Sequence, residues 1–260
     1  MDQAPPSLLL DARRLAKAFG GMTVVNEMSL QMGRGEILGI IGPNGAGKTT
    51  LFNLLAGAIP LDRGQIVLDG QDLSGKGPEA RIGAGLARTF QIPRPFARMT
   101  VLENVMTAAQ GQSGEGLFSA LLAPARSAAQ ERANAARARD LLDFVSLSHL
   151  EDQPAAVLSG GQRKLLELAR AMMAEPRLIL LDEPAAGVNP ALLDLIIDRI
   201  STVNAQGVAV LLIEHNMEMI ARLCPRVIVM AAGKPLAEGR PEDVSRRADV
   251  IEVYLEGMPG

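Results

Sequence analysis

One short glycine-rich stretch constrains the fold of this chain more than any other. Residues 42–49 read GPNGAGKT and fit the pattern G-x-x-x-x-G-K-T. The apolar run Ile37–Ile41 precedes them and predicts a buried strand. Leu51 and Leu54 follow on one face of a helix that should end near Gly57. A strand, a glycine loop and a helix in this order predict a phosphate-binding loop.

The residue types in this loop suit a nucleoside triphosphate. Glycines let successive backbone N–H groups approach phosphate oxygens, and the N-terminus of the helix adds donors and a favourable dipole. Lys48 supplies a positive charge for the terminal phosphates, and the Thr49 hydroxyl can ligate Mg²⁺. A glycine-rich turn before an unrelated helix is the simpler alternative, but Lys48-Thr49 and both flanks argue against it.

The composition is that of an ordinary globular protein. Of 260 residues, 48% are hydrophobic and 21% are charged, and the net charge of -3 gives no general case for binding nucleic acid. Aromatic residues make up only 3%, which disfavours a base-stacking surface. The single Cys224 rules out an internal disulfide and fits a reducing compartment. We find no signal peptide and no apolar run long enough to span a membrane.

The remaining pattern predicts an α/β fold with an insertion. Residues 15–30 predict two antiparallel strands joined at Gly20-Gly21, whereas strands and helices alternate from residue 158 onward and predict a parallel sheet. Between them, residues 92–157 predict a helical subdomain, in which Thr100 and Glu103 have the spacing of a capping box. We therefore expect a nucleotide-binding core (1–91 and 158–240), an inserted helical subdomain (92–157) and a helical tail (241–260).

Two carboxylates follow an apolar strand in the second half of the chain. Residues 178–181 are all apolar, and the two carboxylates Asp182 and Glu183 follow them directly. In phosphate-binding-loop NTPases such a strand lies beside the loop strand. Asp182 would then hold the Mg²⁺ shell opposite Thr49, and Glu183 would orient and polarise the attacking water.

A second glycine-containing motif, Ser159-Gly160-Gly161-Gln162, opens another predicted helix. Its N–H groups form a second anion-binding terminus, which a chain with one complete phosphate loop does not need for the same phosphate. The motif makes sense if it covers the nucleotide held by another copy of the chain.

These motifs, in this order, resemble those of the ATP-binding subunits of ABC transporters over nearly the whole chain. The resemblance implies a P-loop NTPase core with a RecA-like parallel sheet, an N-terminal antiparallel β-subdomain and an inserted α-helical subdomain. It implies ATP and Mg²⁺ as cofactors. The residues matching the Walker A loop are Gly42, Pro43, Asn44, Gly45, Ala46, Gly47, Lys48, Thr49 and Thr50.

The resemblance also assigns the other motifs. Residues 159–162 match the signature that closes over the ATP of the opposite subunit, and residues 178–183 match Walker B with its metal-binding Asp182 and catalytic Glu183. Gln91 matches the Q-loop glutamine, a contact to Mg²⁺ and water, and His215 matches the switch histidine that touches the γ-phosphate.

Two positions depart from the family pattern. Phe19 matches the base-stacking aromatic, where the family more often has Tyr; packing of Phe19 in the core is the alternative. Asn189 stands where the D-loop usually has Asp, so it keeps the hydrogen-bonding shape and loses the charge. We expect the contact across the subunits to survive this change.

Several segments are similar to those of branched-chain amino acid importers, namely residues 88–91, 93–96, 99–105 and 250–255. Urea importers and the lipopolysaccharide-export ATPase share much of this pattern and stay as alternatives. The resemblance implies a second ATPase subunit, identical or paralogous, membrane-embedded permease subunits docked at residues 92–105, and indirectly a solute-binding protein. It places the chain at the cytoplasmic face of the membrane. The alternative from another class is a soluble ABC ATPase of DNA repair or translation. Such proteins usually carry two cassettes, a long coiled coil or basic extensions, and the sequence shows none of these features.

Overall fold

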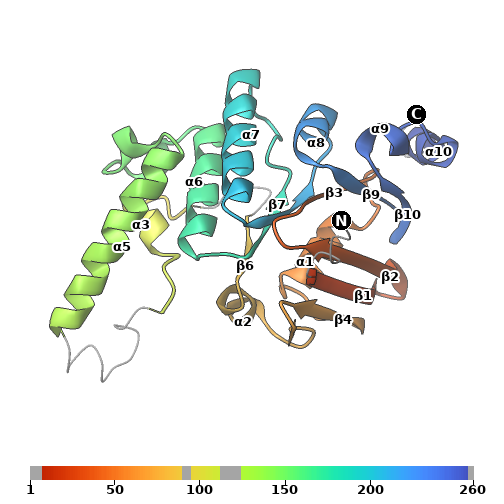
Figure 1. Ribbon diagram of the computed structural model, residues 1–260, viewed down its shortest axis with the longest axis horizontal. Helices are drawn as coiled ribbons and strands as arrows, with labels where there is room; N and C mark the ends of the chain where they lie inside the picture. The colour runs from red at the N-terminus through yellow and green to blue at the C-terminus, as the bar shows by residue number, and fades with distance from the viewer. Residues whose placement is uncertain (1–7, 90–94, 112–123, 257–260) are drawn as a thin grey trace, which may run out of the picture. The chain divides into compact units, whose positions relative to one another are not determined.

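The computed structural model describes residues 8–89, 95–111 and 124–256 (Figure 1). The chain forms two compact units. The first unit contains residues 1–91, 177–186 and 193–260, and the second contains residues 92–176 and 187–192. Both sheets and the glycine-rich loop belong to the first unit.

The core of the first unit is a six-stranded sheet with the order β10-β9-β3-β8-β7-β6. All its neighbouring strands pair in parallel except β10, which runs antiparallel to β9. Every residue of β3, β7 and β8 is buried, as expected for parallel strands covered on both faces. The parallel sheet predicted from the sequence is therefore present, but the strand ending in Asp182 (β7) does not lie beside the loop strand (β3) as expected, because β8 pairs with both and separates them. Its strands are β3 (Ile37–Ile41), β6 (Leu86–Arg88), β7 (Leu178–Asp182), β8 (Ala209–Ile213), β9 (Arg226–Ala231) and β10 (Lys234–Gly239).

A second sheet in the same unit is antiparallel and has the order β2-β1-β4-β5. Its first two strands turn at Gly20 and Gly21, whose φ angles of 54° and 86° lie in the left-handed region that glycine adopts readily. This is the antiparallel N-terminal sheet that the sequence predicts. Its strands are β1 (Leu8–Phe19), β2 (Met22–Gly33), β4 (Arg63–Leu68) and β5 (Gln71–Asp72).

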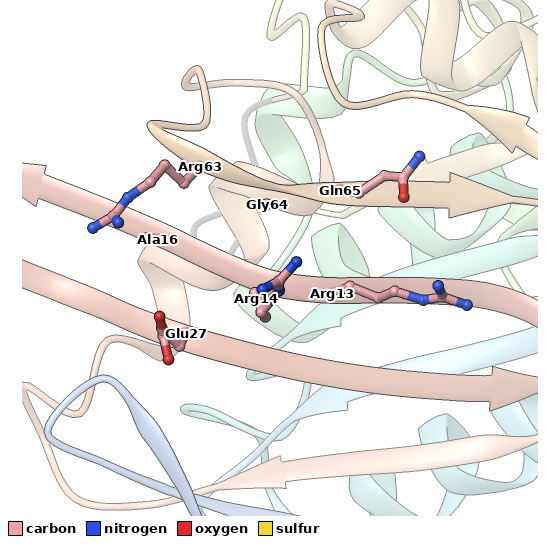
Figure 2. A pocket seen from close by; sticks show the side chains of 7 residues that line it. All are labelled: Arg13, Arg14, Ala16, Glu27, Arg63, Gly64 and Gln65. Atoms are coloured by element: carbon pink, nitrogen blue, oxygen red, sulfur yellow. The ribbon is translucent and has the colours of Figure 1, made fainter.

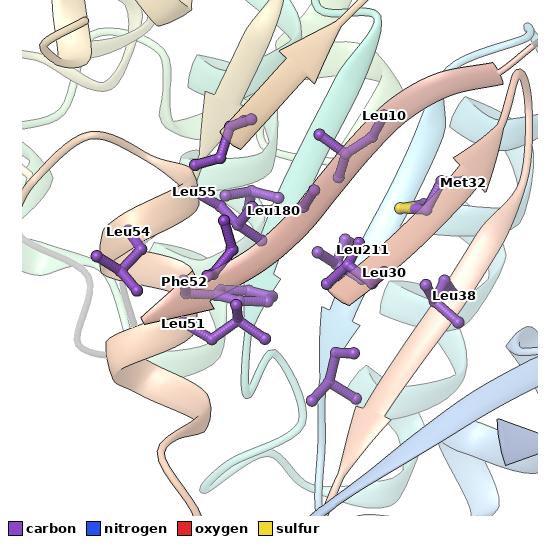
Figure 3. Packing of buried hydrophobic residues seen from close by; sticks show 14 of the residues in the cluster. Leu10, Leu30, Met32, Leu38, Leu51, Phe52, Leu54, Leu55, Leu180 and Leu211 are labelled. Atoms are coloured by element: carbon purple, nitrogen blue, oxygen red, sulfur yellow. The ribbon is translucent and has the colours of Figure 1, made fainter. Parts of the chain in front are cut away.

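The hydrophobic core of the first unit lies where α1 (Lys48–Leu55) packs against strands of both sheets (Figure 3). Four α1 side chains (Leu51, Phe52, Leu54 and Leu55) are fully buried, together with Leu180 of β7 and Leu211 of β8. Because α1 begins directly after the glycine-rich loop, this packing fixes where the loop sits. The other helices of the unit are α2 (Pro78–Gly83), α7 (Pro190–Ala205) from residue 193 onward, α8 (Met217–Leu223), α9 (Pro241–Val244) and α10 (Ala248–Glu256).

A buried arginine from α2 completes the C-terminal end of α1. Arg81 donates from Nη1 to the carbonyl oxygens of Leu54 (2.6 Å) and Leu55 (2.5 Å). Its Nη2 donates to the Leu73 oxygen (2.8 Å) and its Nε to the Lys76 oxygen (2.9 Å). Burial lowers the pKa of this guanidinium. Arg81 thus satisfies carbonyl groups that the end of a helix leaves without partners.

The second unit is helical. Three helices, α3 (Val101–Met106), α5 (Pro124–Phe144) and α6 (Gly160–Met173), contact one another. Two short 3-10 helices, Ser148–Leu150 and Ala155–Val157, lie between α5 and α6 in the chain. The predicted capping box is present at α3, where Thr100 Oγ1 accepts from the Glu103 N–H (3.1 Å) and Glu103 Oε2 accepts from the Thr100 N–H (2.8 Å). Among the helices described, none is long and apolar enough to cross a bilayer.

Candidate nucleotide-binding site

The glycine-rich loop joins β3 to α1 and has the backbone that its glycines allow. Gly42, Gly45 and Gly47 have φ angles of 148°, 79° and 93°. A Cβ at Gly42 would overlap the Met230 carbonyl oxygen, whereas a Cβ at Gly45 would meet no atom within 4 Å. Gly42 is therefore required by packing, and Gly45 only by backbone conformation.

Lys48, the first residue of α1, folds back over the loop. Its ammonium group donates to the carbonyl oxygens of Gly42 (2.7 Å) and Pro43 (2.8 Å), and the residue is only 6% exposed. Burial lowers the pKa of Lys48, while the negative charges of Glu183 and Asp182 oppose this shift. The Lys48 ammonium is therefore held beside the loop, where it can bind the phosphates of a nucleotide.

A groove of about 290 Å³ opens beside the loop. It brings together residues that are far apart in the sequence: the start of β2, the loop and the start of α1, and the residues that follow β7 and β8. Seven of the nine residues predicted to form the phosphate loop line this groove, all except Gly42 and Pro43, together with the predicted Glu183 and His215. The groove is lined by Val24, Asn44, Gly45, Ala46, Gly47, Lys48, Thr49, Thr50, Glu183 and His215.

Asp182 ends β7 as a buried carboxylate whose side chain is only 1% exposed. Burial raises the pKa of Asp182, and its bond to Arg88 opposes the shift. Its Oδ1 atom has no hydrogen-bond partner among the residues described. An orphaned buried carboxylate oxygen suits a cation. Among the described residues, no group of three or more His, Cys, Asp or Glu side chains could hold a metal ion by itself. Mg²⁺ bound at Asp182 would therefore also need Thr49 and phosphate oxygens as ligands.

Arg88, at the end of β6, is a site residue that the sequence analysis did not assign. Its Nη2 lies 3.1 Å from Asp182 Oδ2, and its Nη1 donates to Asn53 Oδ1 of α1 at 2.6 Å. The guanidinium carbon also lies 6.0 Å from the centre of the Phe52 ring. Arg88 therefore ties the acidic end of β7 to the helix that carries the phosphate loop. Only its position three residues before Gln91 could have drawn attention to it.

Glu183 and His215 follow neighbouring parallel strands and face each other. In the register of β7 and β8, Asp182 pairs with Ile213, so Glu183 and His215 lie just beyond the same end of the two strands. His215 Nε2 lies 3.3 Å from Glu183 Oε1, and both side chains are partly exposed to the groove. The structure thus brings together the two residues predicted to act at the γ-phosphate.

Ser159 to Gln162 lie in the second unit, at the start of α6. Ser159 Oγ accepts from the Gln162 N–H (3.3 Å), and Gln162 Oε1 accepts from the Ser159 N–H (2.9 Å), which forms a second capping box. Gly161 packs so closely on the Leu192 side chain that a Cβ there would overlap it. By position in the helix, the N–H groups of Gly160 and Gly161 have no partner within α6.

Phe19 is 49% exposed at the end of β1, with the Lys17 ammonium 5.5 Å from its ring centre, so it does not pack in the core. Asn189 Oδ1 accepts from the Leu192 N–H (2.9 Å) at the start of α7, a capping bond that Asp would also make. Gln91 lies outside the described residues.

A larger groove, of about 440 Å³, lies over the antiparallel sheet (Figure 2). Arg13 and Arg14 of β1 and Arg63 of β4 line it, together with Glu27 of β2. Figure 2 shows the three guanidinium groups spread along the strands, without a common point. This groove is charged, but its side chains do not converge on a ligand in the way that those around Lys48 do.

Comparison with known proteins agrees with this geometry. The sequence profile of the ABC transporter family matches residues 25–186. A probable branched-chain amino acid transport ATP-binding protein, LivG, of Archaeoglobus fulgidus is 40% identical over 247 residues, which is 95% of each chain. The high-affinity branched-chain amino acid transport ATP-binding protein LivG of Escherichia coli K12 is 40% identical over 249 residues, covering 95% of this chain and 97% of its own.

Solved structures show the same likeness. A nucleotide-free ATP-binding cassette from an ABC transporter superposes with a TM-score of 0.81 at 34% identity, covering 95% of this chain and 98% of that one. The ADP conformation of an ATP-binding cassette gives the same values. A family profile over more than half of the chain, together with relatives at 40% identity over nearly all of it, establishes the family. The chain belongs to the ABC transporter family and is one of its ATP-binding cassette ATPases.

Proposed function

We propose that this chain is the energy-coupling subunit of an ABC importer for branched-chain or related amino acids. One observation carries the ATPase part of the proposal: Lys48, Glu183 and His215 line a single groove beside the phosphate loop. The substrate class is supported by relatives named as branched-chain amino acid transport proteins that match 95% of the chain at 40% identity.

Different predicted site residues would carry out the separate steps of ATP binding and hydrolysis. The loop amides and Lys48 bind and orient the β- and γ-phosphates. Thr49, Asp182 and Gln91 would hold Mg²⁺, which would neutralise charge on the phosphates. Glu183 orients the attacking water and accepts its proton, and His215 contacts the γ-phosphate. Phe19, exposed at the end of β1, offers its ring to the adenine base.

A second copy or a paralogue supplies the remaining contacts. The Ser159 hydroxyl and the N–H groups of Gly160 and Gly161 form an anion-binding helix start that covers the γ-phosphate held by the partner subunit. Each site then needs two chains, so ATP joins the subunits and its hydrolysis releases them. This cycle is a conformational gate, and the chain does no chemistry on the transported solute.

The closing and opening of the two ATPase subunits would change the conformation of membrane-embedded permease subunits. We place their dock at residues 92–105, which follow Gln91 directly in the chain, and the chain itself on the cytoplasmic face of the membrane as a peripheral subunit. A solute-binding protein on the other face would deliver the amino acid. The net charge of -3 gives no support for nucleic acid as a partner.

The test is reconstitution with the permease subunits that copurify with the full-length chain from membranes of its source. Proteoliposomes should take up leucine, isoleucine or valine only when ATP and the matching binding protein are present. Uptake of urea in place of these amino acids, or extraction of lipopolysaccharide, would replace the proposed substrate and leave the ATPase role intact. Recovery with ribosomes or DNA in place of permeases would contradict the transport role itself.

A further inference from the structure

Glu214, the residue directly after β8, is a buried carboxylate with an unusual set of partners. It is 3% exposed, although it stands next to the partly exposed His215. Its Oε1 accepts from the Ala185 N–H at 2.6 Å, and its Oε2 accepts from the N–H groups of His215 (2.8 Å) and Asn216 (2.9 Å). One carboxylate therefore binds the loop after β7 with one oxygen and the loop after β8 with the other.

The loop after β7 begins with a strained residue. Glu183 has a φ angle of 49°, in the left-handed region that non-glycine residues rarely adopt. Such a conformation costs about 1–3 kcal/mol and persists only where the surroundings hold it. Backbone hydrogen bonds help to hold this turn: the Glu183 N–H donates to the Ile213 oxygen (2.9 Å), and the Ala186 N–H donates to the Glu183 oxygen (3.1 Å). The Ala185 bond to Glu214 lies within the same turn.

We propose that Glu214 is a positioning residue for ATP hydrolysis. Its carboxylate fastens the strained turn of Glu183 to the loop of His215, and thereby keeps Glu183 Oε1 and His215 Nε2 in the facing arrangement seen at 3.3 Å. Glu214 does not line the groove, so it acts on the reaction only through these two residues. The inference rests on the proposed roles of Glu183 and His215.

The chemistry requires a carboxylate at this position. An ionised carboxylate has two oxygens that accept hydrogen bonds and no donor, which matches three N–H groups arriving from two sides. Glutamine has the same shape but one acceptor oxygen and an NH₂ group. In either orientation its NH₂ group would face the N–H of Ala185 or the N–H groups of His215 and Asn216. Glu214→Gln would therefore break the link between the two loops with little change in volume.

The experiment uses the full-length chain and compares wild type with Glu214→Gln, Glu183→Gln and the double variant. ATP turnover, the KM for ATP, ATP affinity and the thermal unfolding midpoint are measured for each. Glu218→Gln is the matched control, because Glu218 lies on α8 with its side chain 63% exposed. We expect Glu218→Gln to match wild type in ATP turnover, KM for ATP, ATP affinity and unfolding midpoint.

We expect Glu214→Gln to lower kcat roughly 100-fold, the scale of a displaced catalytic group, with ATP affinity changed less than about threefold. In the Glu183→Gln background the same change should alter turnover less than about twofold, because residues that act as a unit are not additive. If Glu214→Gln fails to fold, Glu214→Asp is measured instead. It keeps the charge but is one methylene too short to reach both loops, and its kcat should fall at least about tenfold.

A lower unfolding midpoint with unchanged kcat would show that Glu214 only supports the fold, and would overturn the inference. Equal fold-losses in both backgrounds would overturn it too, because Glu214 would then act independently of Glu183. If Glu183→Gln itself turns over ATP at the wild-type rate, the proposed role of Glu183 fails first. The two failures are therefore distinguishable.

Discussion

The Arg88 guanidinium lies 3.1 Å from the Asp182 carboxylate, with the two side chains 12% and 1% exposed. Arg88 also donates to Asn53 of α1 at 2.6 Å, so one partly buried cation joins the residue expected to hold Mg²⁺ to the helix of the phosphate loop. The pair holds one oxygen of Asp182 and leaves the other, Oδ1, without a hydrogen bond among the described residues. Arg88 thereby orients the carboxylate for a cation.

Arg88→Met should therefore damage both stability and metal binding. Removing one partner of a buried ion pair leaves an uncompensated charge, which costs about 3–5 kcal/mol. We expect a loss of that size in urea unfolding and a weaker Mg²⁺ dependence of ATP affinity. Arg177→Met is the control, because the Arg177–Asp69 pair is more exposed and should contribute at most about 1 kcal/mol. Equal losses in the two variants would contradict this account.

Two glycines of the phosphate loop should differ sharply in their tolerance of alanine. Gly42→Ala would drive a Cβ into the Met230 carbonyl, a backbone atom that cannot move aside, so it should destabilise the protein by more than about 3 kcal/mol. Gly45→Ala meets no neighbour and should cost only about 1 kcal/mol for its left-handed backbone. Thermal unfolding without nucleotide separates these cases. Similar losses for both would mean that packing at Gly42 is not the constraint.

Much of this arrangement could be predicted from the sequence, because local chemistry specifies it. Short apolar runs predicted the buried strands β3, β7 and β8, and the spacing of Thr100 and Glu103 predicted a capping box that the structure contains. The strand β10 was not predicted. It is a half-exposed edge strand with Pro235, so it lacks the apolar pattern that marked the others.

The contacts that join distant segments could not be predicted in this way. Arg81 is an arginine on a short helix in the sequence, and only the fold places it under the end of α1. Arg88 and Glu214 resemble ordinary charged residues at the ends of strands, yet the largely buried Arg88 and the buried Glu214 both bond to segments far away in the chain. Phe19 allowed core packing or an exposed platform, and only the structure excludes the core.

The single cysteine gives a pH dependence with a defined sign. Burial, helped by the charge of Glu214, raises the pKa of the Cys224 thiol to about 12. The unfolded thiol ionises near pH 8.5, so above that pH the folded state binds more protons than the unfolded state and loses stability as the pH rises. This loss should approach about 1.4 kcal/mol per pH unit until pH 12. Urea unfolding at pH 8, 9 and 10 should show a shallower decline for Cys224→Ala; parallel declines would contradict the buried thiol.

Ser159 allows its two roles, helix cap and proposed lid, to be separated. Ser159→Asp keeps a good N-cap, so the unfolding midpoint should stay near wild type, but it places a negative charge where the partner's γ-phosphate should bind. We expect ATP-dependent dimerisation to weaken at least about tenfold. Thr100→Asp makes the same change at the other capping box and should leave dimerisation unaffected. A Ser159→Asp variant that dimerises normally with ATP would contradict the lid.

The steady-state ATP turnover of full-length Glu183→Gln, with ATP affinity measured on the same sample, tests the account most directly. Glutamine keeps the shape of the side chain and cannot accept the proton of the attacking water. We expect turnover to fall by about 100-fold or more while ATP binding through Lys48 and the loop is retained, so that an ATP-bound dimer accumulates. Turnover at the wild-type rate would contradict the assignment of Glu183, and with it the chemistry proposed for this groove.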